Sequence, residues 1–264
     1  MNILLVSGTT VAGLVIGGAF DPVGQRLADR SREQDERRRA ERRATDDESG
    51  SEPDDPPGPG SETADGPVRH VLPSGPAPAR TISAAVVTGA LFGAAAHHFG
   101  PDLVLAPFCV FFAMLVVVSV TDLTHRLVPR HLLYGALSLI VPLLVASAAV
   151  DHQWRDVSGA AIAGAVSFGL FFAVWWFVPR GLGFGDVRLA GVIGITVGYL
   201  SLLHAYVAFL AGFIIGLLFG LVLMVSTSSG RKTRIPFAPS LALGAVIAVF
   251  WGGHVAHTLF HAGG

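Results

Sequence analysis

The sequence predicts an all-α, polytopic membrane protein with about eight transmembrane helices and a disordered cytoplasmic segment. Hydrophobic residues make up 52% of the 264 residues and charged residues only 14%, well below the roughly 25% of an ordinary soluble domain. The mean hydropathy is +0.59. Apolar segments of about 20 residues, the length of one bilayer crossing, recur along the chain. These observations exclude an ordinary soluble domain.

The first two predicted regions differ in composition. Residues 1–20 carry no charged side chain, and basic residues follow this run instead of preceding it, which favours a retained first transmembrane helix over a cleaved signal peptide. Residues 21–80 hold most of the acidic residues of the chain and are rich in proline, glycine and serine towards their end. A segment of this composition buries too little apolar surface to fold, so we expect it to be largely disordered.

The third region, residues 81–264, is expected to be a seven-helix membrane core. Short polar breaks separate its apolar segments, and each segment is predicted to form one helix: residues 82–99, 102–121, 132–150, 158–178, 187–201, 204–226 and 237–258. Basic residues in short loops mark the cytoplasmic side of a membrane protein. They concentrate in the loops at 122–131, 179–188 and 227–236, which we therefore place in the cytoplasm together with residues 21–80.

Two acidic residues, Asp122 and Asp186, stand at the ends of membrane-length apolar segments. An unpaired carboxylate at the edge of a bilayer is energetically costly, so each of them is a candidate functional residue. Two predicted crossings separate them, which returns both carboxylates to the same cytoplasmic face. The sequence therefore predicts that they form a pair.

Paired carboxylates favour the chemistry of an aspartyl protease. Two neighbouring carboxyl groups do not both ionise readily, so they share one proton at neutral pH. The ionised member accepts a proton from water, and the protonated member donates to the peptide carbonyl, without a metal or a cofactor. Asp186 opens a helix, whose amino end favours negative charge, whereas Asp122 ends one. From the sequence we expect Asp122 to carry the shared proton and Asp186 to be the base.

Glycines have two expected roles in this core. Gly181, Gly183 and Gly185 lack a Cβ atom, so the backbone before Asp186 can adopt positive φ and pass close to an extended substrate strand. Farther along, residues 212–220 repeat Gly-x-x-x-Gly and place three glycines on one helical stripe. Such a stripe predicts close contact between two helices.

Four segments resemble a known family. Residues 183–186 read Gly-Phe-Gly-Asp, which resembles the Gly-x-Gly-Asp signature of intramembrane aspartyl proteases, and the following Val-Arg-Leu resembles the Val-Lys-Leu of the bacterial type IV prepilin peptidase (leader peptidase) family. In that family a short polar run after the first aspartate ends in Ile-Pro, and here Asp122 is followed by Leu-Val-Pro at 127–129. Residues 235–239 resemble the family's Ile-Pro-Phe-Gly-Pro, with alanine in the glycine place, and residues 18–27 resemble its opening.

The resemblance implies an aspartyl endopeptidase in the inner or plasma membrane, with its active site facing the cytoplasm. Its implied partners are the lipid bilayer and pilin-like precursors, which combine a short basic leader with a hydrophobic helix and are cleaved at the junction. No nucleic acid is expected. The expected site residues are the catalytic Asp122 and Asp186 and the substrate-binding Gly183, Phe184, Gly185, Pro236 and Phe237.

One departure from the family pattern and two alternative interpretations remain at this point. Family members often carry two Cys-x-x-Cys pairs in the region that corresponds to residues 21–80, together with an N-methyltransferase activity. Here that region has no cysteine, so the methyltransferase activity is not expected. The alternative from another class is a transporter or permease that uses the aspartates to bind protons or ions. A Gly-x-Gly-Asp protease of the presenilin-like group is a closer alternative, against which the segments at 127–129 and 235–239 argue.

Overall fold

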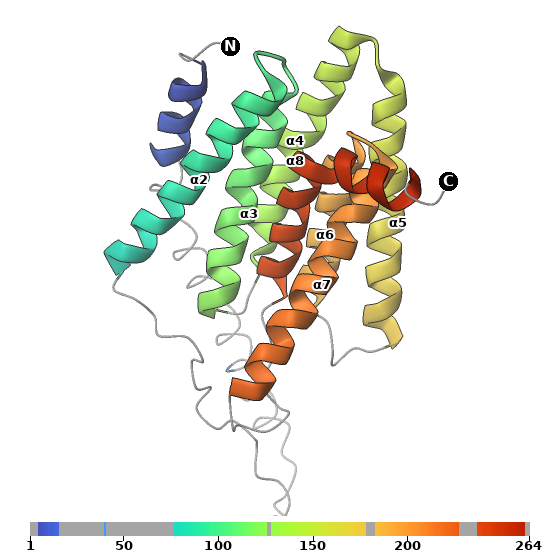
Figure 1. The fold of residues 1–264 in the computed structure, drawn as a ribbon. Helices are drawn as coiled ribbons and strands as arrows, with labels where there is room; N and C mark the ends of the chain where they lie inside the picture. Colours follow the sequence, from blue (N-terminus) through green and yellow to red (C-terminus); the bar gives the residue numbers. More distant parts are fainter. Residues whose placement is uncertain are drawn as a thin grey trace, which may run out of the picture.

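A computed structural model of the chain describes residues 5–15, 40, 77–125, 128–177, 183–226 and 237–261. Within these ranges the regular structure is helical, and no strand occurs. A short apolar helix, Leu5–Val15, comes first (Figure 1). Seven further helices follow: α2 (Ala77–Phe99), α3 (Leu105–His125), α4 (Arg130–Asp151), α5 (Trp154–Phe177), α6 (Phe184–Gly198), α7 (Leu202–Ser226) and α8 (Ala238–His261).

The predicted all-α polytopic fold is confirmed, because six of these helices are long and apolar enough to cross a membrane. Each of the seven apolar segments predicted after residue 81 corresponds to one helix. The exception in length is α6, which was predicted as a full crossing over residues 187–201. It has 15 residues, or about 22 Å at about 1.5 Å per residue, against a hydrocarbon core of about 30 Å.

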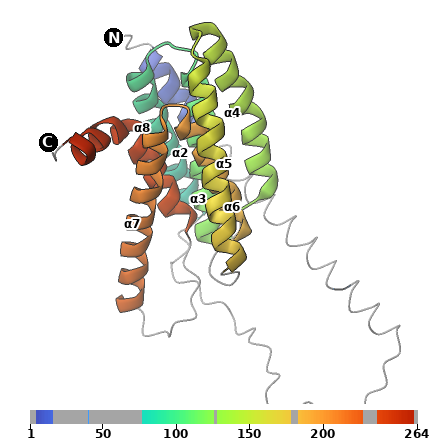
Figure 2. The same cartoon turned by 90° about the vertical axis from the view of Figure 1, so that its right-hand side faces the viewer.

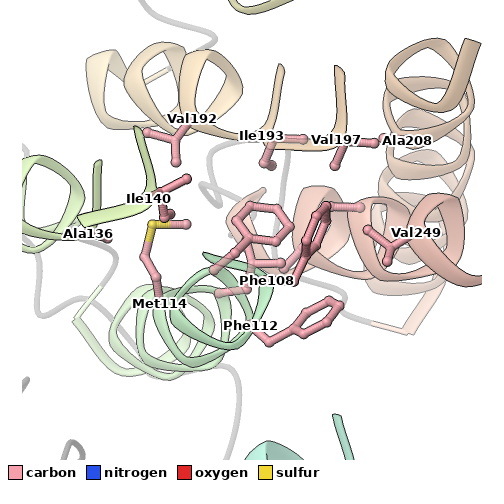
Figure 3. Close-up of a cluster of buried hydrophobic side chains, with 14 of the residues drawn as sticks. Phe108, Phe112, Met114, Ala136, Ile140, Val192, Ile193, Val197, Ala208 and Val249 are labelled. Atoms are coloured by element: carbon pink, nitrogen blue, oxygen red, sulfur yellow. The ribbon is translucent and has the colours of Figure 1, made fainter. Parts of the chain in front are cut away.

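Helix α6 is the central element of the bundle. Most of its side chains are buried, and Figure 3 shows Val192, Ile193 and Val197 in a cluster with Phe108 and Phe112. The cluster joins α6 to side chains of α3, α4, α7 and α8. A short central helix of this kind is held on all sides by longer ones, which fixes the position of its first turn.

Small residues bring α5 and α6 into close contact along their length (Figure 2). A Cβ atom added at Gly194 would lie 2.7 Å from the carbonyl oxygen of Ala163 and 2.7 Å from the hydroxyl oxygen of Ser167. At Gly198 it would meet Ala163 as well, and at Gly191 it would touch the ring of Phe168. These glycines recur on one face of α6, so the two helix backbones approach closely without intervening side chains.

The predicted glycine stripe of residues 212–220 does make a helix contact. Gly212 lies against Leu241 of α8, and Gly216 lies against the ring of Phe237 and against Ser240. From the α8 side, Gly244 packs on the backbone of α7 at Gly212. Helices α7 and α8 therefore form a tightly packed pair, and this pair determines where α8 begins.

Helices α4 and α5 run out and back between α3 and α6. As a result α3 ends at the same end of the bundle at which α6 and α8 begin (Figure 1). Asp122 lies in the last turn of α3, and Asp186 lies in the first turn of α6. Both aspartates therefore belong to one end of the molecule.

Candidate active site

The carboxylate of Asp122 is buried and receives a backbone hydrogen bond from another helix. Its side chain is 6% exposed, and its Oδ2 atom accepts a hydrogen bond of 3.2 Å from the N–H of Ala238. Ala238 is the first residue of α8 and is itself fully buried. The first N–H groups of a helix have no acceptor within the helix, so Asp122 supplies one of them with a partner.

Contacts with α7 hold the start of α8 in place. The carbonyl oxygen of Phe237 accepts hydrogen bonds from the N–H groups of Ser240 and Leu241, which closes the first turn. The ring of Phe237 packs on Gly216 and lies 5.7 Å from the ring of Phe213, measured between centroids. The predicted substrate contact Phe237 is thus placed as an anchor of α8 on α7. Its neighbour Pro236 lies outside the described residues.

Asp186 is held within its own helix. Gly183 caps α6 with extended backbone angles, φ −75° and ψ 141°, and its carbonyl oxygen accepts a 3.0 Å hydrogen bond from the N–H of Asp186. A Cβ atom added at Gly183 would lie 3.3 Å from Oδ2 of Asp186. The carboxyl group therefore folds back over the cap, close to the amino end of α6.

Asp186 lies at the start of α6, outside the six helices long enough to span a membrane. Burial and, after it, the nearby charge of Asp122 raise the pKa of Asp186 to about 7. A hydrogen bond with the backbone of Gly183 opposes this rise. The two predicted catalytic residues are thus close enough for the charge of one to act on the other.

The contact between α8 and Asp122 was not part of the sequence-based location of the shared proton. That hypothesis placed the proton on Asp122 and considered only the two helices that carry the aspartates. The structure adds the amino end of a third helix, whose first N–H group donates to Asp122. A packing contact between residues 116 positions apart has no signal in the sequence.

Where the structure describes these glycines, they do not use the positive φ angles that glycine permits. Gly183 has a φ of −75°, Gly185 lies inside α6, and among the described glycines only Gly100 has a positive φ. Gly181 lies outside the described residues. Gly185 has a different role, because an added Cβ atom there would lie 2.8 Å from the Cβ atom of Val128. The missing side chain lets α6 approach the segment that follows Asp122.

The remaining predicted substrate contact, Phe184, points towards α5. Its ring centroid lies 5.1 Å from that of Trp175, and the guanidinium carbon of Arg188 lies 4.5 Å above the Phe184 ring. Arg188 also lies 5.6 Å from the ring centroid of Tyr134 in α4. Phe184 therefore packs the start of α6 against its neighbours. The other two aromatic residues of this group, Trp175 and Tyr134, were not predicted as part of the site.

The arrangement supplies two carboxyl groups and fixed backbone donors. In the part of the chain that the structure describes, no group of three or more His, Cys, Asp or Glu side chains is arranged to hold a metal ion. One carboxyl group interacts with the start of α8 and the other with the start of α6. Such a pair is suited to moving protons to and from a bound carbonyl group and a water molecule.

Comparison with known proteins identifies similar chains. Residues 109–221 match the model of the type IV leader peptidase family, and this range contains both Asp122 and Asp186. The chain is 34% identical over 171 residues to the prepilin leader peptidase/N-methyltransferase of Bacillus subtilis, covering 64% of this chain and 65% of that protein. No solved structure is significantly similar to the chain.

Proteins of the same name from Xanthomonas campestris and Legionella pneumophila are also similar. They are 30% and 29% identical over 143 and 160 residues, which covers 52% and 60% of this chain and 47% and 54% of the relatives. The chain therefore spans about half to two thirds of the length of the curated relatives that it matches.

Proposed function

Because residues 109–221 match the model of the type IV leader peptidase family, we propose that the chain is a membrane-embedded aspartyl endopeptidase acting on prepilin-like precursors. One observation carries the proposal: Asp122 and Asp186 come from separate helices and lie at the same end of the bundle, and the nearby charge of Asp122 contributes to the raised pKa of Asp186. The printed names of the relatives, prepilin leader peptidase, support the same reaction and substrate class.

The proposed reaction needs one proton on the pair. The ionised carboxylate accepts a proton from water while the water oxygen forms a bond to the peptide carbonyl carbon, and the protonated carboxyl group gives its proton to the carbonyl oxygen. When the tetrahedral intermediate collapses, the C–N bond breaks and the leaving nitrogen takes the proton that came from water. The new carboxyl group returns the other proton, so the pair is restored.

The proposed substrate is a precursor with a short basic leader and a hydrophobic helix. The loops next to both aspartates are rich in arginine, which supports a cytoplasmic position for this end of the bundle in the plasma membrane. An active site at the cytoplasmic membrane face suits a scissile bond at the junction of leader and helix. Gly183 and Gly185 are the proposed contacts of the substrate strand, because Gly183 caps α6 and Gly185 lies in its first turn next to Asp186.

The proposal is limited to the peptidase reaction. The relatives are named as both peptidases and N-methyltransferases. Residues 21–80 of this chain contain no cysteine, so the Cys-x-x-Cys pairs expected for the family in this region are absent from the sequence. We therefore propose no methyl transfer and no cofactor for this chain.

Cleavage of a pilin-type precursor by the purified protein tests the function. We expect the protein, in detergent or in vesicles, to shorten a precursor that has a basic leader and one apolar helix, with the new amino terminus at their junction. Mass spectrometry of the product locates the cut. A matched precursor without the apolar helix should remain intact. Failure of the folded protein to cut the complete precursor would contradict the proposal.

We expect kcat/KM to decrease as the pH rises above about 7. The pKa of Asp186 is raised to about 7, so above this pH the pair loses the proton that the carbonyl oxygen needs. The rate should then decrease about tenfold for each further pH unit. Initial rates of precursor cleavage from about pH 5 to about pH 9 measure this limb. A rate that still rises at about pH 9 would contradict the assignment.

A further inference from the structure

The start of α8 distinguishes the two aspartates from each other, and this inference rests on the proposed function and deepens it. We propose that the backbone N–H of Ala238 positions Asp122 as the proton acceptor of the pair, which leaves the shared proton on Asp186. Ala238 is then a positioning residue that acts through its main chain. The segment at 235–239 contributes to the site by placing a helix terminus beside a carboxylate.

The geometry at Asp122 favours its charged form. The Ala238 nitrogen lies 3.2 Å from Oδ2, and Ala238 is fully buried, so no solvent competes for this donor. A hydrogen bond to a carboxylate is strengthened by the charge, and the amino end of a helix adds a partial positive charge. The dipole of α3, whose last turn contains Asp122, opposes this effect. The inference is that the direct hydrogen bond outweighs it.

The charged and titratable groups near Asp122 come from two neighbouring helices. Helix α6 carries Asp186, whose like charge disfavours a second ionisation, and Arg188, which packs on the rings of Phe184 and Tyr134. Arg130 and His131, at the start of α4, are exposed. The first turn of α8, from Ala238 to Leu241, has no titratable side chain, so it acts on Asp122 through a main-chain donor.

Packing on α7 keeps this helix terminus rigid. The Phe237 ring fills the space left by Gly216, and Leu241 fills the space beside Gly212. An added Cβ atom at Gly216 would lie 2.9 Å from the Phe237 ring. A donor that cannot move towards or away from Asp122 costs no reorganisation when charge shifts during the reaction.

Ala238→Pro tests the inference directly, because proline lacks the N–H but is accepted in the first turn of a helix. We expect kcat to fall about tenfold or more with KM nearly unchanged, and the acidic limb of the kcat/KM profile to move up by about one pH unit. Ala238→Gly retains the N–H and should lose clearly less activity. Equal losses in the two variants, or no loss in the proline variant, would overturn the inference.

Gly216→Ala tests the same inference without altering the donor. The added methyl group should push the Phe237 ring and displace the start of α8. The acidic limb of the kcat/KM profile should therefore move to higher pH, as in Ala238→Pro. Gly169→Ala is the matched control on α5, because an added Cβ atom there has no neighbour within 4 Å, and its activity should be unchanged. If Ala238→Pro does not fold, an unshifted limb in Gly216→Ala overturns the inference.

An infrared titration separates this inference from the proposed function. Subtracting the spectrum of an Asp122→Asn, Asp186→Asn double variant isolates the carboxylic acid band of the pair. This band should titrate in two steps, one for each proton of the pair. In Ala238→Pro the step at lower pH should move to higher pH by about one unit, whether or not a precursor is cleaved. An unmoved step would overturn the inference, whereas absence of cleavage by the wild-type protein would overturn the function alone.

Discussion

Asp122→Asn and Asp186→Asn are each expected to reduce precursor cleavage by about 10³-fold or more. An amide can neither accept the proton of water nor deliver a proton to the carbonyl oxygen, so either substitution removes one half of the acid and base pair. The two losses should not add, because the residues act as one unit. Single-turnover cleavage rates of the purified variants measure the effect.

Asp102→Asn is the matched control, since Asp102 is exposed and lies in the connection between α2 and α3. It should cleave at the wild-type rate. Full activity of Asp122→Asn or of Asp186→Asn would contradict the proposal that the two aspartates form a catalytic pair. The same experiment addresses the transporter alternative, because a transporter would not cleave the precursor even in its wild-type form.

Gly194→Leu is expected to have the largest effect on stability. Its side chain would have to enter the contact between α5 and α6, where a Cβ atom alone would lie 2.7 Å from the Ala163 carbonyl oxygen. Overpacking of this kind costs about 1–3 kcal/mol and sometimes more, and both contacting atoms belong to packed helices. The unfolding temperature in detergent, followed by circular dichroism, should fall markedly.

Gly169→Leu provides the matched comparison for this substitution. Gly169 lies on α5, and no atom lies within 4 Å of an added Cβ atom there. The same leucine should therefore be tolerated with little change in the unfolding temperature. Equal stability of the two variants would show that the close approach of α5 and α6 does not support the fold.

Much of the helix layout was predictable because membrane spans have a strong length and composition signal. The predicted segment 132–150 corresponds to α4, which ends at Asp151, and 204–226 corresponds to α7, which ends at Ser226. The prediction was least accurate for α6, which is shorter than a full crossing. Its apolar composition suggested a crossing, but its short length reflects burial among other helices, and hydropathy does not separate burial in protein from burial in lipid.

The candidate site was predictable at the level of residue types and not at the level of contacts. Asp122 and Asp186 stood out because charges are rare beside apolar segments. The partner of Asp122 did not, because Ala238 contributes a main-chain N–H that every residue except proline possesses. Likewise Gly185 was recognised as special, but its reason is the side chain of Val128 and not an unusual backbone angle.

The main-chain hydrogen bond at Asp122 also affects how mutational surveys of the proposed active site should be read. Position 238 is already alanine, so an alanine scan passes over it, and most substitutions there retain the donor. A survey limited to side chains would therefore assign the whole importance of this segment to its prolines and its aromatic ring, and would miss the group that touches the carboxylate.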